Sequence, residues 1–116
     1  MKIYLFDVDE TLEISGGPIK LQSLMDLRIA GHAVGLNGNW AALVSKVPGW
    51  QHLVSFFNVG LPKDVYIQQL RAFIAAEEFV MVGNILGVSG GSDDQGAAVR
   101  AGIRFIQEAD FARGVR

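Results

Sequence analysis

The chain has 116 residues, which suits one domain covering residues 1–116 and leaves no room for a second of ordinary size. It contains no cysteine, so disulfide frameworks, thiolate nucleophiles and zinc–thiolate sites are excluded. Ten Lys and Arg residues stand against 12 Asp and Glu, and this net charge of -2 argues against nucleic acid or an anionic membrane as a partner. Hydrophobic residues make up 50% of the chain, which excludes disorder and leaves a homo-oligomer open.

The first half of the chain predicts strand and helix in alternation. The strand formers of Lys2–Phe6 end abruptly at an acid, which is typical of a buried strand followed by a polar loop. Residues 18–31 follow the pattern of an amphipathic helix, with proline at its start and glycine at its end. A second apolar strand is expected at Ala33–Leu36, then a turn at 37–39 and a helix over 40–47.

The second half continues the alternation. The expected elements are a helical turn at 50–53, a strand at 54–57, a helix from Pro62 onward, a strand at 78–82, a helix at 94–102 and a strand at 103–106. Strands that alternate with helices predict a parallel sheet covered by helices on both faces. A ligand site is expected at the carboxyl ends of the strands, near the point where the strand order reverses.

Two further features bear on location and on the core. Asp7 interrupts the first apolar run, so no signal-peptide region forms there, and the uncharged run at 79–92 is too short to span a bilayer. The sequence therefore predicts a cytoplasmic protein. Core packing is expected of the aromatic residues that fall within apolar periodic segments: Trp40, Trp50, Phe56, Phe57 and Phe73.

The most informative stretch is Asp7-Val8-Asp9-Glu10-Thr11, directly after the first strand. Two carboxylates in such close sequence are costly to hold together unless a cation neutralises them. An EF-hand is excluded because Leu12 stands where that loop needs glycine and Pro18 where it needs glutamate. The alternative is that both acids only cap a turn.

An apolar strand followed by Asp-x-Asp-x-Thr resembles the first motif of the haloacid dehalogenase-like (HAD) superfamily of phosphohydrolases. The resemblance implies that Asp7 attacks phosphorus to form an aspartyl-phosphate and that Asp9 is the general acid and base. It also implies a magnesium cofactor, bound partly through the Asp9 carbonyl, and a substrate-binding role for Thr11. A nucleophile and a proton donor on either side of a metal-held phosphoryl group account chemically for this spacing.

The next two family motifs are substituted or partial. Asn37 stands where the family has a phosphate-binding Ser or Thr, so that Asn37 and Gly38 are expected at the substrate, although Asn-Gly is also a common turn. The resemblance implies that Lys63, near the start of a helix, is the family's catalytic lysine. A solvated surface role is the alternative for Lys63, and Lys46 is the substitute candidate.

The fourth motif has Asn84 where the family has a metal-binding aspartate after Gly83. The spacing to Ala101-Gly102 aligns Asp94 with the family's second acid of this motif. The resemblance therefore implies metal binding by Asp7, Asp9, Asn84 and Asp94. Because an amide carries no charge, magnesium is expected to bind weakly. Asp93 and Asp94 have a second interpretation, as caps of the helix that follows.

The sequence holds no insertion large enough for a cap domain, so the resemblance implies a small capless member of the superfamily. Its expected fold is a three-layer, doubly wound, Rossmann-like α/β sheet of about five parallel strands. The expected function is hydrolysis of a phosphomonoester, large if the substrate itself must cover the open site. A catalytically impaired relative that binds a phosphorylated ligand or a protein partner is the alternative.

A phospho-receiver domain is the weakest interpretation. That class needs an acceptor aspartate after the third strand and a lysine after the fifth. This chain has Asn58 and Gln107-Glu108 at those places.

Overall fold

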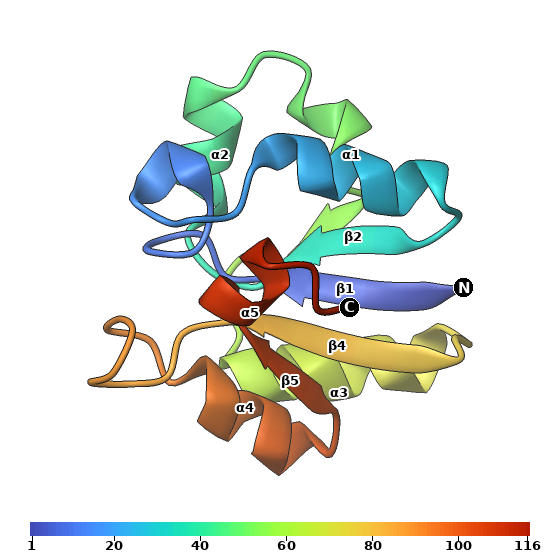
Figure 1. The fold of residues 1–116 in the computed structure, drawn as a ribbon. Helices are drawn as coiled ribbons and strands as arrows, with labels where there is room; N and C mark the ends of the chain where they lie inside the picture. The colour runs from blue at the N-terminus through green and yellow to red at the C-terminus, as the bar shows by residue number, and fades with distance from the viewer.

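The computed structural model describes residues 1–116 as one open sheet of five parallel strands with helices around it (Figure 1). The strands are β1 (Lys2–Phe6), β2 (Ala33–Leu36), β3 (Phe56–Phe57), β4 (Glu78–Gly83) and β5 (Arg104–Gln107). Their order across the sheet is β3-β2-β1-β4-β5, and every neighbouring pair is parallel. The predicted doubly wound α/β fold is confirmed.

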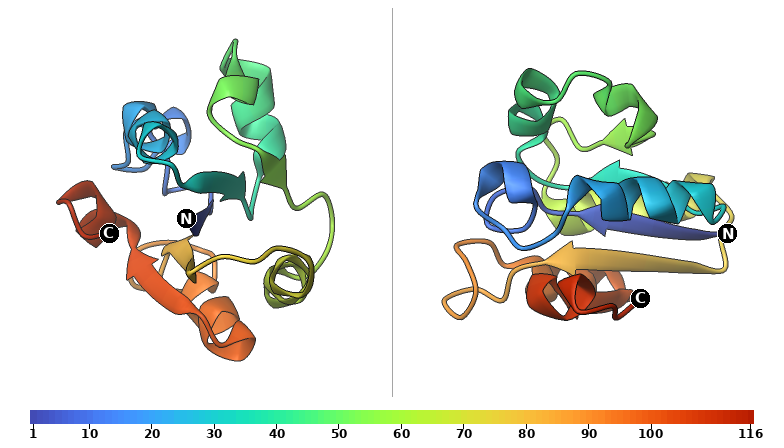
Figure 2. Two further views of the ribbon diagram at one scale, coloured as in Figure 1. Left: turned by 90° about the vertical axis from the view of Figure 1, so that its right-hand side faces the viewer. Right: turned by 45° about the horizontal axis from the view of Figure 1, so that its top comes forward.

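Five helices connect and cover the strands. They are α1 (Leu21–Ile29), α2 (Trp40–Lys46), α3 (Lys63–Phe73), α4 (Asp94–Ala101) and α5 (Glu108–Ala112), with short 3₁₀ turns at Glu13–Ser15 and Trp50–His52. Figure 2 shows α1 and α5 on one face of the sheet and α3 and α4 on the other. None of the helices is long and apolar enough to cross a lipid bilayer.

The alternation of side chains along β1 explains why both faces are covered. Tyr4 and Phe6 belong to the core that includes residues of α1, α2 and α5, whereas Ile3 and Leu5 belong to the core beneath α3 and α4. All four side chains are almost wholly buried. A strand that is apolar on both faces, as β1 is from Ile3 to Phe6, is typical of the centre of a parallel sheet.

Four details differ from the sequence-based expectations. The helix expected from residue 18 begins at Leu21, because Ile19 instead pairs with Leu12 in a short bridge. The third strand is two residues long, and α5 was not expected at all. The prediction that Phe73 packs in the core is wrong, since its side chain is 87% exposed.

The buried stripe of α3 explains the exposure of Phe73. Ile67 is fully buried, and Leu70 and Ile74 pack against the same core. Phe73 is the last residue of α3, and Ile74 already has an extended backbone, so the contact with the core passes to Ile74 while the Phe73 ring stays outside at the end of the helix.

The strand order reverses at β1, which lies between β2 and β4. Chain segments leaving β1 and β4 therefore emerge side by side at the carboxyl edge of the sheet, toward which all the arrowheads in Figure 1 point. Asp7 follows β1 and Asn84 follows β4, so the topology brings the first and fourth motifs together. A receiver domain has the strand order 2-1-3-4-5, and the observed order excludes that interpretation.

Candidate functional site

The ammonium group of Lys63 lies between two buried carboxylates at the carboxyl edge of the sheet. Its Nζ is 3.0 Å from Asp7 Oδ1 and 2.6 Å from Asp94 Oδ1. Asp7 follows β1, Lys63 begins α3 and Asp94 begins α4, so residues distant in sequence meet here. Asp7 and Asp94 are only 2% and 0% exposed, so a cation is needed to offset their charge.

Burial and the neighbouring charges shift the pKa values of both Lys63 and Asp94. Burial by itself lowers the pKa of Lys63, but Asp7 and Asp94 outweigh it, and the net shift of that pKa is upward. For Asp94, burial and the neighbouring charge of Asp7 raise the pKa to about 7, against the opposing effects of Lys63 and the Asn84 N–H. Lys63 is therefore a fixed positive charge at neutral pH, and Asp94 is the acid whose charge is most easily lost.

Asp9, two residues beyond Asp7, is exposed and held from two sides. The Ser15 hydroxyl donates to Asp9 Oδ1 at 2.7 Å, and Asn39 Nδ2 lies 3.3 Å from both carboxylate oxygens. The carboxylate is thus oriented at the surface beside the buried pair. Exposure to solvent suits a group that must exchange protons during a reaction.

Lys63, and not Lys46, is the lysine that reaches the acids. The ammonium of Lys46 donates to the carbonyl of Ile14, 3.3 Å away. Of the two acids, Asp93 is the cap of α4, since its Oδ1 accepts from the Gly96 N–H. Asp94 turns inward to Lys63, and its metal-binding role stays a prediction.

Three buried oxygens at this edge have no hydrogen-bond partner: Asp7 Oδ2, Thr11 Oγ1 and Asn84 Oδ1. Carboxylate and amide oxygens are hard donors of the kind that magnesium takes. Asp94 is differently engaged, since its Oδ1 accepts from Lys63 and its Oδ2 from the Asn84 N–H. A magnesium ion thus fits Asp7 and Asn84 better than Asp94.

No group of three His, Cys, Asp or Glu side chains converges in the way that would hold a metal ion by itself. The oxygens left without a partner belong instead to one carboxylate, one amide and one hydroxyl side chain. Such a set carries little negative charge and favours a weakly bound hard cation.

Asn84 also joins three segments of the edge. Its Nδ2 is 3.2 Å from both the Glu10 carbonyl and Glu108 Oε2. Glu108 is 4% exposed and was not identified from the sequence as a site residue. A signal for it existed, because Glu108 follows β5 as Asp7 follows β1, and charged residues at the carboxyl ends of parallel strands gather at one edge.

Asn37 is wholly buried, and the nitrogen and the oxygen of its side-chain amide both form hydrogen bonds within the chain. Nδ2 donates to the Lys63 carbonyl at 3.2 Å, and Oδ1 accepts from Asn58 Nδ2 at 3.1 Å. Asn58 Oδ1 in turn accepts from the N–H groups of Gly60 and Leu61. This asparagine pair supports the turn that leads into Lys63, and a phosphate-binding role for Asn37 stays a prediction.

Gly38 lies directly against the proposed nucleophile. A Cβ at this position would be 2.2 Å from Asp7 Oδ1 and 3.2 Å from the Val8 nitrogen. Any side chain here would displace Asp7, which explains the need for glycine.

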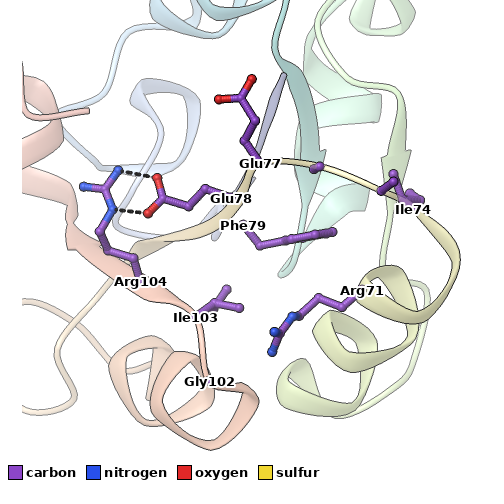
Figure 3. Close-up of a pocket in the computed structure, with 10 residues that line it drawn as sticks. Arg71, Ile74, Glu77, Glu78, Phe79, Gly102, Ile103 and Arg104 are labelled. Atoms are coloured by element: carbon purple, nitrogen blue, oxygen red, sulfur yellow. Dashed lines mark hydrogen bonds and ion pairs between the residues drawn. The ribbon is translucent and has the colours of Figure 1, made fainter.

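The largest cavity, about 470 Å³, lies at the opposite edge of the sheet (Figure 3). It is bordered by the beginnings of β4 and β5, where Arg104 makes a two-pronged ion pair with Glu78, and by Arg71 of α3. None of the four acids at the carboxyl edge borders it: Asp7, Asp9, Asp94 and Glu108. A smaller cavity of about 260 Å³ lies beside Lys63, at the edge where parallel sheets bind their ligands.

No family model, curated protein or solved structure matches the chain significantly. A fold of this kind supports many unrelated activities. The function must therefore be argued from the chemistry of Asp7, Asp9, Lys63 and their neighbours.

Proposed function

We propose that this protein is a magnesium-dependent phosphomonoester hydrolase that works through an aspartyl-phosphate on Asp7. The observation that carries the proposal is the state of the Asp7 carboxylate. It is buried, one oxygen is bound to Lys63, the other has no partner, and the oriented carboxylate of Asp9 follows two residues later. The resemblance of Asp7-Val8-Asp9-Glu10-Thr11 to the HAD motif supports the same chemistry.

In the first half-reaction, a carboxylate oxygen of Asp7 forms a bond to phosphorus while the ester P–O bond breaks. Asp9 gives its proton to the departing alkoxide. In the second half-reaction, Asp9 takes a proton from water, the water oxygen bonds to phosphorus, and the bond to Asp7 breaks to release phosphate. The ammonium of Lys63, 3.0 Å from Asp7 Oδ1, places a positive charge beside the carboxylate that attacks phosphorus.

A magnesium ion would be held by Asp7, Asn84 and the main-chain carbonyl of Asp9, and it would offset the charge of the phosphoryl oxygens. Asn84 contributes an oxygen without a charge, so millimolar magnesium is the expected working range. Asp94 acts through Lys63, which it holds toward Asp7.

The test is phosphate release from 4-nitrophenyl phosphate, with magnesium and with chelator, by the native protein and by Asp7→Asn. We expect magnesium-dependent turnover that falls by a factor of about 10³ or more in Asp7→Asn, because the nucleophile is lost. Asp26→Asn is the matched control, since Asp26 is exposed on α1 and contacts only Gln22. Equal rates in the native protein and Asp7→Asn would refute the mechanism.

The second candidate is a catalytically impaired protein that binds a phosphorylated ligand or a partner protein. The observation in its favour is Asn84, whose amide is engaged with Glu108 and Glu10. Thermal unfolding separates the two candidates: stabilisation by inorganic phosphate but not by magnesium, together with absent turnover, would favour this second function.

A further inference from the structure

The cavity of about 260 Å³ beside Lys63 opens between the turn after β2 and the turn after β3. Its lining residues are Gly38, Asn39, Trp40, Asn58, Val59, Gly60, Leu61 and Lys63. Three of them belong to the candidate site as well: Lys63 and Gly38 lie against Asp7, and Asn39 donates to Asp9. A molecule seated in the cavity would therefore have one end at both aspartates.

Three of the eight lining residues provide apolar walls: Trp40, Val59 and Leu61. Trp40 stacks on Phe57 with ring centroids 4.9 Å apart and planes within 12°, so the indole is held in place. Val59 and Leu61 line the same cavity while remaining 72% and 40% exposed. Aliphatic side chains that border a cavity and are not covered by the chain itself provide apolar surface for a ligand.

The cavity has no free positive charge. Lys63 is its only charged lining residue, and the Lys63 ammonium already lies between Asp7 and Asp94. The amide of Asn58 is also occupied, by Asn37 and by the backbone of residues 60 and 61. A second phosphate or a carboxylate would find no free cationic side chain here. A neutral group needs no such partner and enters without leaving a charge unpaired.

The volume of this open cavity suits a small bound group. About 260 Å³ corresponds to roughly nine water molecules, at the ~30 Å³ that each occupies in the liquid. This is slightly below the range of ~300–1,000 Å³ that is usual for drug-sized ligands. A single ring or a short alkyl chain matches it.

We propose that the substrate is a small phosphomonoester whose organic group is neutral and apolar, and that this cavity binds that group. The inference rests on the proposed function and deepens it, since it selects a small aryl or alkyl phosphate over a phosphorylated macromolecule. Trp40 and Leu61 form the walls against the organic group, while the phosphate lies at Asp7 and Asp9.

The first experiment compares kcat/KM for phenyl phosphate, glycerol 2-phosphate and a phosphoserine peptide. We expect phenyl phosphate to be preferred at least about tenfold over the polar glycerol ester, because only phenyl matches the apolar walls. Leu61→Ala should lower kcat/KM for phenyl phosphate about fivefold and leave glycerol 2-phosphate nearly unchanged. Ile29→Ala is the control, since Ile29 is 76% exposed at the end of α1 and should change neither.

A second experiment separates binding in the cavity from turnover. Phenol is titrated into the native protein and into Leu61→Glu, and backbone amide NMR shifts are followed. Shifts at Gly60 and Leu61 in the native protein, abolished by Leu61→Glu, are the expected result. If these shifts occur but no phosphate ester is hydrolysed, the cavity binds apolar groups and the proposed hydrolase function fails.

The opposite combination would overturn the inference. In that case turnover depends on magnesium, phenol causes no NMR shifts, and the native protein and Leu61→Ala have equal rates. The hydrolase function would then hold, but the proposal that this cavity binds the organic group would be wrong. A preference for the phosphoserine peptide that Leu61→Ala does not alter would show that a macromolecule is the substrate.

Discussion

At the scale of single residues, buried polar atoms divide into those that the fold satisfies and those that it does not. Asn58 and Asp94 use their polar atoms within the chain, whereas Asp7 Oδ2 and Asn84 Oδ1 have no partner. Leaving a buried polar atom unsatisfied costs about 1–3 kcal/mol. Several unsatisfied polar atoms together at the carboxyl edge of a sheet are best explained by a ligand that binds them. A single unsatisfied polar atom elsewhere is a local packing defect.

Tyr66 on α3 is such an isolated case, with a buried hydroxyl that has no partner and a side chain that is 8% exposed. Tyr66→Phe should therefore preserve the free energy of unfolding at neutral pH or raise it by up to about 1 kcal/mol, measured by urea titration. Tyr4→Phe is the matched control. The Tyr4 hydroxyl donates to the Arg116 carbonyl, so its loss should lower stability by about 0.5–1 kcal/mol.

Alkaline pH provides an independent test of the same residue. Burial raises the pKa of Tyr66 to about 12, from 10 in the unfolded chain. The folded state thus favours the protonated phenol, so this contribution to stability is complete below pH 10 and is lost as pH rises toward 12. The loss should total about 2–3 kcal/mol and should be absent in Tyr66→Phe. An identical alkaline decline in both proteins would contradict this account.

At the scale of elements, α4 is the one helix whose N-cap residue bonds to the first turn through its side chain. Asp93 Oδ1 accepts from the Gly96 N–H at 3.0 Å, which satisfies one of the free donors of the first turn. Asp93→Ala should lower the free energy of unfolding by about 1 kcal/mol. Asp26→Ala removes only an exposed contact with Gln22 and should cost less than about 0.5 kcal/mol. Denaturant midpoints of the two variants that coincide would show that the cap is unimportant.

At the scale of the whole molecule, Asn84 joins the loops that leave β1, β4 and β5, and its exchange for aspartate tests the metal site. In Asn84→Asp a new carboxylate would face Glu108 at the present 3.2 Å contact, so without metal the protein should lose about 2 kcal/mol of stability. With magnesium the added charge should tighten binding, and the metal-induced rise in Tm should exceed that of the native protein.

The double variant Asn84→Asp/Glu108→Gln controls for the new repulsion. It should recover most of the stability lost without metal while keeping the larger magnesium response. If magnesium raises the Tm of Asn84→Asp no more than that of the native protein, then residue 84 lies outside the metal site.

The sequence by itself determined the strand and helix alternation, and with it the parallel sheet. Every position from Ile3 to Phe6 is apolar, and the helices α2 and α4 end at clear stop signals, all of which are local patterns. The same reasoning located Asp7 and Asp9, because two acids directly after a buried strand need no tertiary information to stand out. It failed for Phe73, since the helical period does not say where the helix ends, and Phe73 is the last residue of α3.

Only the tertiary structure decided which side chains meet. Lys63 and Asp94 come from separate helices, and their contact with Asp7 depends on the strand order β3-β2-β1-β4-β5. The partners of Asn37, the burial of Glu108 and the cavity beside Trp40 likewise depend on how two or three loops pack at one edge. Local sequence patterns set the conformation of each segment, but contacts between segments follow from burying the shared faces of the sheet, and no segment carries that information alone.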